Sequence, residues 1–218
     1  MRTRSEHNVE LLQDEFALYG VLGIPANARG VILFAHGSGS GRLSPRNTLV
    51  ARFLQDHGLA TLLLDLLRPD ETGDRRNVFN IDLLAERLRL ATAWLGKDTR
   101  TTGLPIGLFG ASTGAGAALQ AAATLPLSIH AVVSRGGRPD LADAYLPSVT
   151  APTLLIVGGN DGSVVEINRS AYERLTSEKH MIIVPGATHL FEEPGTLEQV
   201  AEEAHRWFLR FLSEKRSA

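Results

Sequence analysis

A serine between two glycines, in the run Gly-Ala-Ser-Thr-Gly at residues 110–114, constrains the fold of this chain more than any other feature. An apolar run over residues 104–109 precedes it and an Ala- and Leu-rich run over residues 115–125 follows, which predicts a strand, a sharp turn and a helix. This context is typical of a nucleophile elbow, whose strained turn lifts the serine hydroxyl clear of a sheet. We expect glycine at 110 and 114 because the entering strand and the leaving helix pass too closely for side chains. The alternative is an ordinary Gly/Ser-rich turn.

Short apolar runs alternate with amphipathic segments from residue 31 onward, which is typical of a parallel sheet with crossover helices. The predicted parallel strands are residues 31–35, 59–66, 104–109, 128–134, 152–157 and 179–184, and residues 8–13 and 16–24 predict an antiparallel hairpin. Between 134 and 152 we expect at most a short helix over 139–144 and no large lid. The fold class is therefore α/β, as a single domain over residues 1–218 with helices on both faces of a mostly parallel sheet.

Composition excludes several classes of function. The net charge of −2 gives no general affinity for nucleic acid or anionic membranes. The absence of cysteine rules out disulfides, thiolate metal sites and a cysteine nucleophile, and it fits a reducing compartment. The first eight residues lack the apolar core of a signal peptide, and no apolar run approaches the roughly 18 residues that span a bilayer. We expect a cytoplasmic protein that binds neither nucleic acid nor membrane.

A serine nucleophile needs a base, and in parallel sheets the reacting groups gather at the carboxyl ends of the strands. Of the seven histidines, only His36 and His189 follow a predicted strand, and His189 is the one for which no other role is evident. Two others begin strands, two lie on helices, one lies in the N-terminal tail, and His36 is expected to brace a Gly-rich loop. We predict His189 as the base, against the alternative of a solvated loop histidine.

Asp161 is the predicted acid, because it follows the strand at 152–157 and lies between Ser112 and His189 in the chain. The order Ser112, Asp161, His189 is the one expected after a G-x-S-x-G elbow. Ser163 and Glu166 predict a capping box for the next helix, so the alternative for Asp161 is an acidic residue at a helix N-terminus. Asp140, which follows the previous strand, is the second candidate for the acid.

A Gly-rich loop over residues 36–41 follows the first parallel strand. We predict that a backbone N–H of Gly37 or Ser38, together with that of Thr113, forms an oxyanion hole. The competing interpretation is a phosphate-binding loop, but the run lacks the lysine and the glycine spacing of the known phosphate motifs.

At this point the chain resembles the α/β-hydrolases over nearly all of its 218 residues. The resemblance rests on the loop that begins at His36, the elbow at 110–114, Asp161 and His189, and the lidless layout is most similar to the dienelactone-hydrolase-like branch. That branch implies about seven or eight strands, no metal and no organic cofactor. Dienelactone hydrolases proper use a cysteine nucleophile where this chain has Ser112, which favours a serine carboxylesterase.

The expected chemistry is ester hydrolysis through an acyl-enzyme, with small or short-acyl esters favoured because aromatic residues are few and no lid is expected. Four residues near the rim are candidate substrate contacts: Ser40, Arg42, Arg135 and Arg138. One interpretation is that these three arginines and Arg46 bind a carboxylate or phosphate group of the substrate. The alternative is that they are surface charges, or that they pair with Glu71 or Asp140. Lactone, thioester, amide or C–C bond hydrolysis, acyl transfer, and a non-catalytic binding module remain open, as do monomer and homodimer.

Overall fold

The computed structural model describes residues 4–13 and 16–212. Their strands form one eight-stranded sheet in the order β1-β2-β4-β3-β5-β6-β7-β8. Its strands are β1 (Arg4–Leu12), β2 (Ala17–Pro25), β3 (Val31–Ala35), β4 (Ala60–Leu64), β5 (Ile106–Ala111), β6 (Ile129–Arg135), β7 (Thr153–Gly158) and β8 (Lys179–Val184). The β1–β2 hairpin is antiparallel, β2 pairs antiparallel with β4, and all later pairs are parallel. The predicted α/β fold with seven or eight strands is confirmed.

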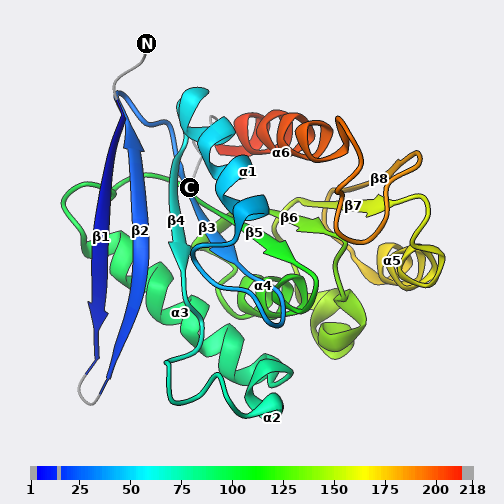
Figure 1. Ribbon diagram of the computed structural model, residues 1–218, viewed down its shortest axis with the longest axis horizontal. Helices are drawn as coiled ribbons and strands as arrows, with labels where there is room; N and C mark the ends of the chain where they lie inside the picture. Colours follow the sequence, from blue (N-terminus) through cyan, green and yellow to red (C-terminus); the bar gives the residue numbers. More distant parts are fainter. Residues whose placement is uncertain (1–3, 14–15, 213–218) are drawn as a thin grey trace.

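Helices cover both faces of this sheet, as Figure 1 shows, with α1 and α6 on one side and α3 and α4 on the other. The helical segments are α1 (Pro45–Asp56), α2 (Arg75–Val78), α3 (Ile81–Lys97), α4 (Thr113–Thr124), the 3₁₀ segment η1 (Pro139–Ser148), α5 (Gly162–Arg174) and α6 (Thr196–Leu212). The central strands β3, β4, β5 and β7 are buried along their whole length, because two apolar clusters pack against the two faces. Within the described ranges, no helix is both long enough and apolar enough to cross a membrane.

The single turn α2 precedes α3, and Asp74 caps it by accepting from the N–H of Arg76 at 2.9 Å. Two local predictions are wrong. The segment after β6 is a ten-residue 3₁₀ stretch rather than a short helix over 139–144, and Pro147 inside it is incompatible with a regular α-helix. The capping box at Ser163 does not form, because α5 already begins at Gly162 with Asp161 as its N-cap.

Close backbone approaches shape the turn between β5 and α4. A Cβ on Gly110 would lie 2.4 Å from Cα of Ala115, so strand and helix pass too closely there, as expected. A Cβ on Gly114 would instead lie 2.3 Å from the carbonyl oxygen of Ala35, at the end of β3. Gly114 is therefore required by the neighbouring strand rather than by the strand that enters the turn. Both contacts hold α4 against the carboxyl edge of the sheet.

Candidate active site

Ser112 lies at the tip of the turn between β5 and α4, with φ of 51° and ψ of −123°. Positive φ is costly for a residue with a side chain and marks a strained functional turn. Ser112 and His189 line one cavity of about 220 Å³, together with Gly37, Ser38 and Arg135. Within the described residues Ser112 and His189 share no hydrogen bond, so they meet only across this cavity.

His189 follows β8, and its Nδ1 lies 2.6 Å from Oδ2 of Asp161, which follows β7. The Asp161 side chain is 15% exposed, against 38% for His189, so the acid is the inner member of the pair. Asp161 is also the N-cap of α5, yet its carboxylate makes no capping hydrogen bond. The carboxylate is thus directed to the imidazole rather than to the helix, and the structure brings together Ser112, Asp161 and His189.

Two glycines that the sequence analysis did not single out hold the histidine loop in place. A Cβ on Gly158, the last residue of β7, would lie 2.5 Å from the carbonyl oxygen of Ala187. Gly136, directly after β6, has φ of 50°, and a Cβ there would lie 3.2 Å from the carbonyl oxygen of His189. Both are strand-end glycines next to predicted catalytic loops, which is the signal that points to them.

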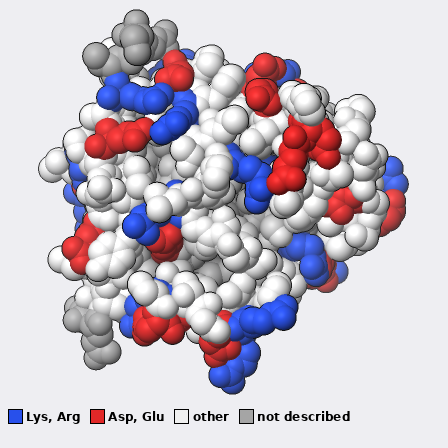
Figure 2. All heavy atoms as spheres, in the orientation of Figure 1, with Lys and Arg blue, Asp and Glu red and all other residues white. Residues whose placement is uncertain are grey.

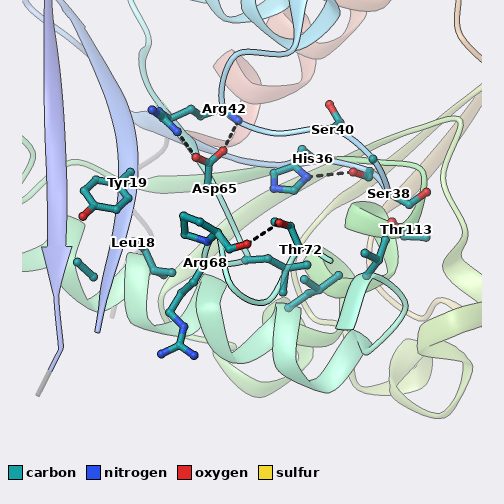
Figure 3. Close-up of a pocket in the computed structure, with 17 residues that line it drawn as sticks. Leu18, Tyr19, His36, Ser38, Ser40, Arg42, Asp65, Arg68, Thr72 and Thr113 are labelled. Atoms are coloured by element: carbon teal, nitrogen blue, oxygen red, sulfur yellow. Dashed lines mark hydrogen bonds and ion pairs between the residues drawn. The ribbon is translucent and has the colours of Figure 1, made fainter. Parts of the chain in front are cut away.

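His36 braces the Gly-rich loop after β3, as predicted. Its Nδ1 lies 3.0 Å from the carbonyl oxygen of Gly37, and its Nε2 lies 3.1 Å from the backbone nitrogen of Leu66. Nδ1 therefore carries the proton and donates, while Nε2 accepts from the Leu66 N–H. This ring ties the loop to the end of β4 and fixes the peptide between Gly37 and Ser38 (Figure 3).

Burial lowers the pKa of His36, and the hydrogen bond to Gly37 and the charge of Asp65 oppose this only in part. The neutral ring is therefore the folded form, so its stabilisation is complete above the ordinary pKa of 6.5 and is lost as pH falls through the lowered pKa. Replacing His36 by alanine leaves the buried N–H of Leu66 without its acceptor, which costs about 2 kcal/mol of unfolding free energy at pH 8.

We expect the stability difference between wild type and His36→Ala to narrow between pH 8 and pH 5 in urea unfolding. A difference that stays constant across that range would show that the ring does not stabilise the loop as the neutral form.

A larger cavity of about 480 Å³ shares Gly37, Ser38 and Ser40 of the Gly-rich loop with the smaller one. Figure 3 shows its polar end, where Asp65 accepts from the backbone N–H of Arg42 at 2.7 Å and pairs with the guanidinium of the same residue. The remaining wall is largely apolar and includes Leu18, Leu67, Val78 and Leu84. Ser38, Ser40 and Thr113 also line this cavity, so it opens beside the predicted oxyanion hole. Asp65 was not singled out from the sequence, although a carboxylate inside the apolar run 59–66 was a signal for it.

The predicted rim arginines have different environments. Arg138 donates to both oxygens of Asp140, at 2.8 and 2.7 Å, so it forms one of the surface pairs considered above. This pairing also places Asp140, the second candidate acid, on Arg138 rather than on His189. Arg42 pairs with Asp65, whereas Arg135 is buried and lines the smaller cavity. Acidic and basic side chains are interspersed on the face in Figure 2, and no face of a single sign forms there.

Comparison with known proteins adds relatives at high identity. No family model matches the chain. A protein of Mycobacterium tuberculosis H37Rv, provisionally named as a phosphoribosyl transferase, is 54% identical over 207 residues, which are 95% of this chain and 47% of that protein. The chain thus spans about half the length of the curated relatives it matches.

Solved structures give the fold and the family. The crystal structure of a dienelactone hydrolase from Anabaena variabilis is 54% identical, with a TM-score of 0.94, over 96% of this chain and 99% of that one. Est1E from Butyrivibrio proteoclasticus has the same fold at 16% identity, with a TM-score of 0.81 over 95% of this chain and 99% of its own. High identity along the full length of the Anabaena protein shows that this chain belongs to the dienelactone-hydrolase-like branch of the α/β-hydrolases.

Proposed function

We propose that this protein is a serine hydrolase that cleaves carboxylic esters with small or short acyl groups. The observation that carries the proposal is the hydrogen-bonded pair of His189 and Asp161, at 2.6 Å, in a loop that shares a cavity with Ser112. A serine on a strained elbow, a histidine and a buried carboxylate are the three groups that acyl transfer needs. A binding module would require none of them in this arrangement.

In the first half-reaction His189 takes the proton of Ser112, and Oγ of the serine forms a bond to the ester carbonyl carbon. The bond from that carbon to the alcohol oxygen then breaks, and His189 gives its proton to the leaving alcohol. In the second half-reaction His189 takes a proton from water, and the hydroxide forms a bond to the acyl carbon. The bond from that carbon to Oγ of Ser112 then breaks, the carboxylic acid leaves, and His189 returns the proton to Ser112. Asp161 fixes the imidazole tautomer through Nδ1 and stabilises the imidazolium in both halves.

Support for the oxyanion hole comes from backbone positions. Thr113 is the first residue of α4, so its N–H has no carbonyl partner within the helix. A Cβ on Gly37 would lie 3.0 Å from Cβ of Ser112, so the Gly-rich loop passes directly over the nucleophile. An N–H of Gly37 or Ser38 and that of Thr113 are the donors we assign to the developing oxyanion.

The names of the relatives favour hydrolysis. The Anabaena relative is titled a dienelactone hydrolase and covers essentially the same chain, whereas the match to the mycobacterial proteins covers 47% of their length. Their phosphoribosyl transferase name therefore describes a much longer protein than the part compared. In our proposal Ser112 is the nucleophile, His189 the base and Asp161 the acid, and a hydrolase needs these three groups.

Two assays on the wild-type protein test the proposal. We expect a fluorophosphonate to add once per chain in intact-mass analysis, and nitrophenyl acetate and butyrate to be hydrolysed with higher kcat/KM than nitrophenyl palmitate. We expect this preference because aromatic residues are few and the segment between β6 and β7 forms the 3₁₀ stretch η1 rather than a large lid. Absence of both adduct and turnover would contradict the proposal and favour a binding role on this scaffold.

A further inference from the structure

Arg135 carries a buried charge for which residues 4–13 and 16–212 provide no counterion. It is the last residue of β6 and is 7% exposed, and among the described residues its Nε and Nη1 have no hydrogen-bond partner. Burial lowers its pKa to about 10, with repulsion from Arg46 as the second cause. Phe191, whose ring lies 5.9 Å from the guanidinium carbon, offers a π-face but no acceptor. Because an unpaired buried charge is strongly unfavourable, this arrangement is typical of a site completed by an anion.

Arg46 brings a second guanidinium to the same cavity. It lies on α1, and its Nε is also buried without a partner in the described part of the chain. Its Nη1 contacts Glu192 at 3.2 Å, but that carboxylate is 64% exposed. Arg42 and Arg138, by contrast, each have a carboxylate partner. Two neighbouring like charges therefore face the space that holds Ser112 and His189, and within the described ranges Arg135 has no carboxylate partner.

The position of His189 decides which part of an ester would meet these arginines; this step rests on the proposed function. The histidine must protonate the leaving alcohol, so the alcohol part has to lie on its side of the nucleophile. His189 lines the 220 Å³ cavity together with Arg135 and Arg46. The 480 Å³ cavity includes Thr113, and its wall is largely apolar beyond the paired Asp65 and Arg42, so it is the space left for the acyl part.

We propose that the leaving alcohol of the natural substrate carries an oxyanionic group, a carboxylate or a phosphate, that binds between Arg135 and Arg46. The acyl part then occupies the larger cavity, against the apolar part of its wall. The anion takes no part in bond breaking: Ser112 gains the acyl group, the alcohol leaves with the proton from His189, and the arginines hold its charged end. Two guanidinium groups are well suited to this task, because each offers several donors to a planar or tetrahedral oxyanion.

A set of acetate and succinate esters tests this assignment. Methyl 4-acetoxybenzoate is neutral, 4-acetoxybenzoate and 4-acetoxyphenyl phosphate carry the anion on the alcohol part, and monophenyl succinate carries it on the acyl part. We expect wild type to prefer at least one alcohol-side anion over the neutral ester by about tenfold or more in kcat/KM, mainly through KM. The preferred member identifies carboxylate or phosphate. Monophenyl succinate should show no such advantage over neutral phenyl acetate.

Two variants distinguish anion binding by Arg135 from a general effect of positive surface charge. In Arg135→Gln the ratio of kcat/KM between the anionic and the neutral ester should fall toward one, whereas Arg138→Gln, which removes a paired surface arginine, should keep the wild-type ratio. Competitive inhibition of wild type by 4-hydroxybenzoate, stronger than by its methyl ester, gives a readout that needs no variant.

Three outcomes would overturn the inference: equal kcat/KM for anionic and neutral esters in wild type, a preference for the acyl-side anion, or an unchanged ratio in folded Arg135→Gln. Failure to hydrolyse any ester would instead contradict the proposed function. Turnover of neutral esters without an anion preference would contradict only this inference, so the two failures are distinguishable.

Discussion

Replacing Ser112 by alanine should lower kcat for short-chain esters by about four to six orders of magnitude and abolish labelling by a fluorophosphonate. The substitution removes Oγ, the atom that forms the bond to the acyl carbon, and leaves Cβ and the backbone of the elbow in place. His189 and Asp161 remain, but the variant has no serine hydroxyl for the histidine to deprotonate. Ester turnover with intact-mass analysis after labelling measures both effects on the same samples.

A second variant at this position shows that lost activity is not lost folding. Ser112 has φ of 51°, a region where glycine is not strained, so Ser112→Gly should be inactive and more stable than wild type by about 1 kcal/mol. Greater stability with no activity would mean that the strain serves function. A fluorophosphonate adduct that persists on Ser112→Ala, or a loss of activity below tenfold, would contradict the assignment of the nucleophile.

Short apolar runs bounded by turns predicted most of the strands of this fold. β3 begins and ends at the expected residues, because every residue in it is apolar and buried. β8 also has the expected bounds, although it is an edge strand in which only Val184 is buried. β1 begins at Arg4, four residues earlier than expected. Its first residues are polar and exposed at the sheet edge, so they carry no hydrophobic period to detect.

The site could be predicted from topology, but not its electrostatics. Parallel strands bring Ser112, Asp161 and His189 to one edge whatever the packing details, and their positions directly after predicted strands make them the candidates. Arg135 and Arg138 both follow the strand predicted over residues 128–134, so the sequence does not distinguish them. Tertiary packing separates them: the first is enclosed beside the cavity, while the second reaches a carboxylate two residues further along the chain. Burial of a charge without a partner is a property of the folded molecule alone.

Replacing Asp161 by asparagine should lower kcat by about three to four orders of magnitude, with little change in the overall fold. Oδ2 of Asp161 accepts from Nδ1 of His189 at 2.6 Å, which leaves Nε2 unprotonated and able to take the proton of Ser112. An asparagine amide can turn its NH2 toward Nδ1, and the ring then carries its proton on Nε2, where it cannot act as the base. Because the carboxylate makes no capping hydrogen bond to α5, the helix loses no bond.

Asp140→Asn is the matched control, because Asp140 was the other candidate acid and has the same residue type. Its carboxylate is on the surface and pairs with Arg138, so the change should cost less than about 1 kcal/mol of stability. We expect its kcat to stay within about twofold of wild type, and urea unfolding of both variants to show that each is folded. Equal losses of kcat in the two variants would mean that net charge near the site, rather than the tautomer fixed by Asp161, controls catalysis. A loss confined to Asp161→Asn would instead assign the orienting role to the one carboxylate in contact with His189, since both variants remove the same charge.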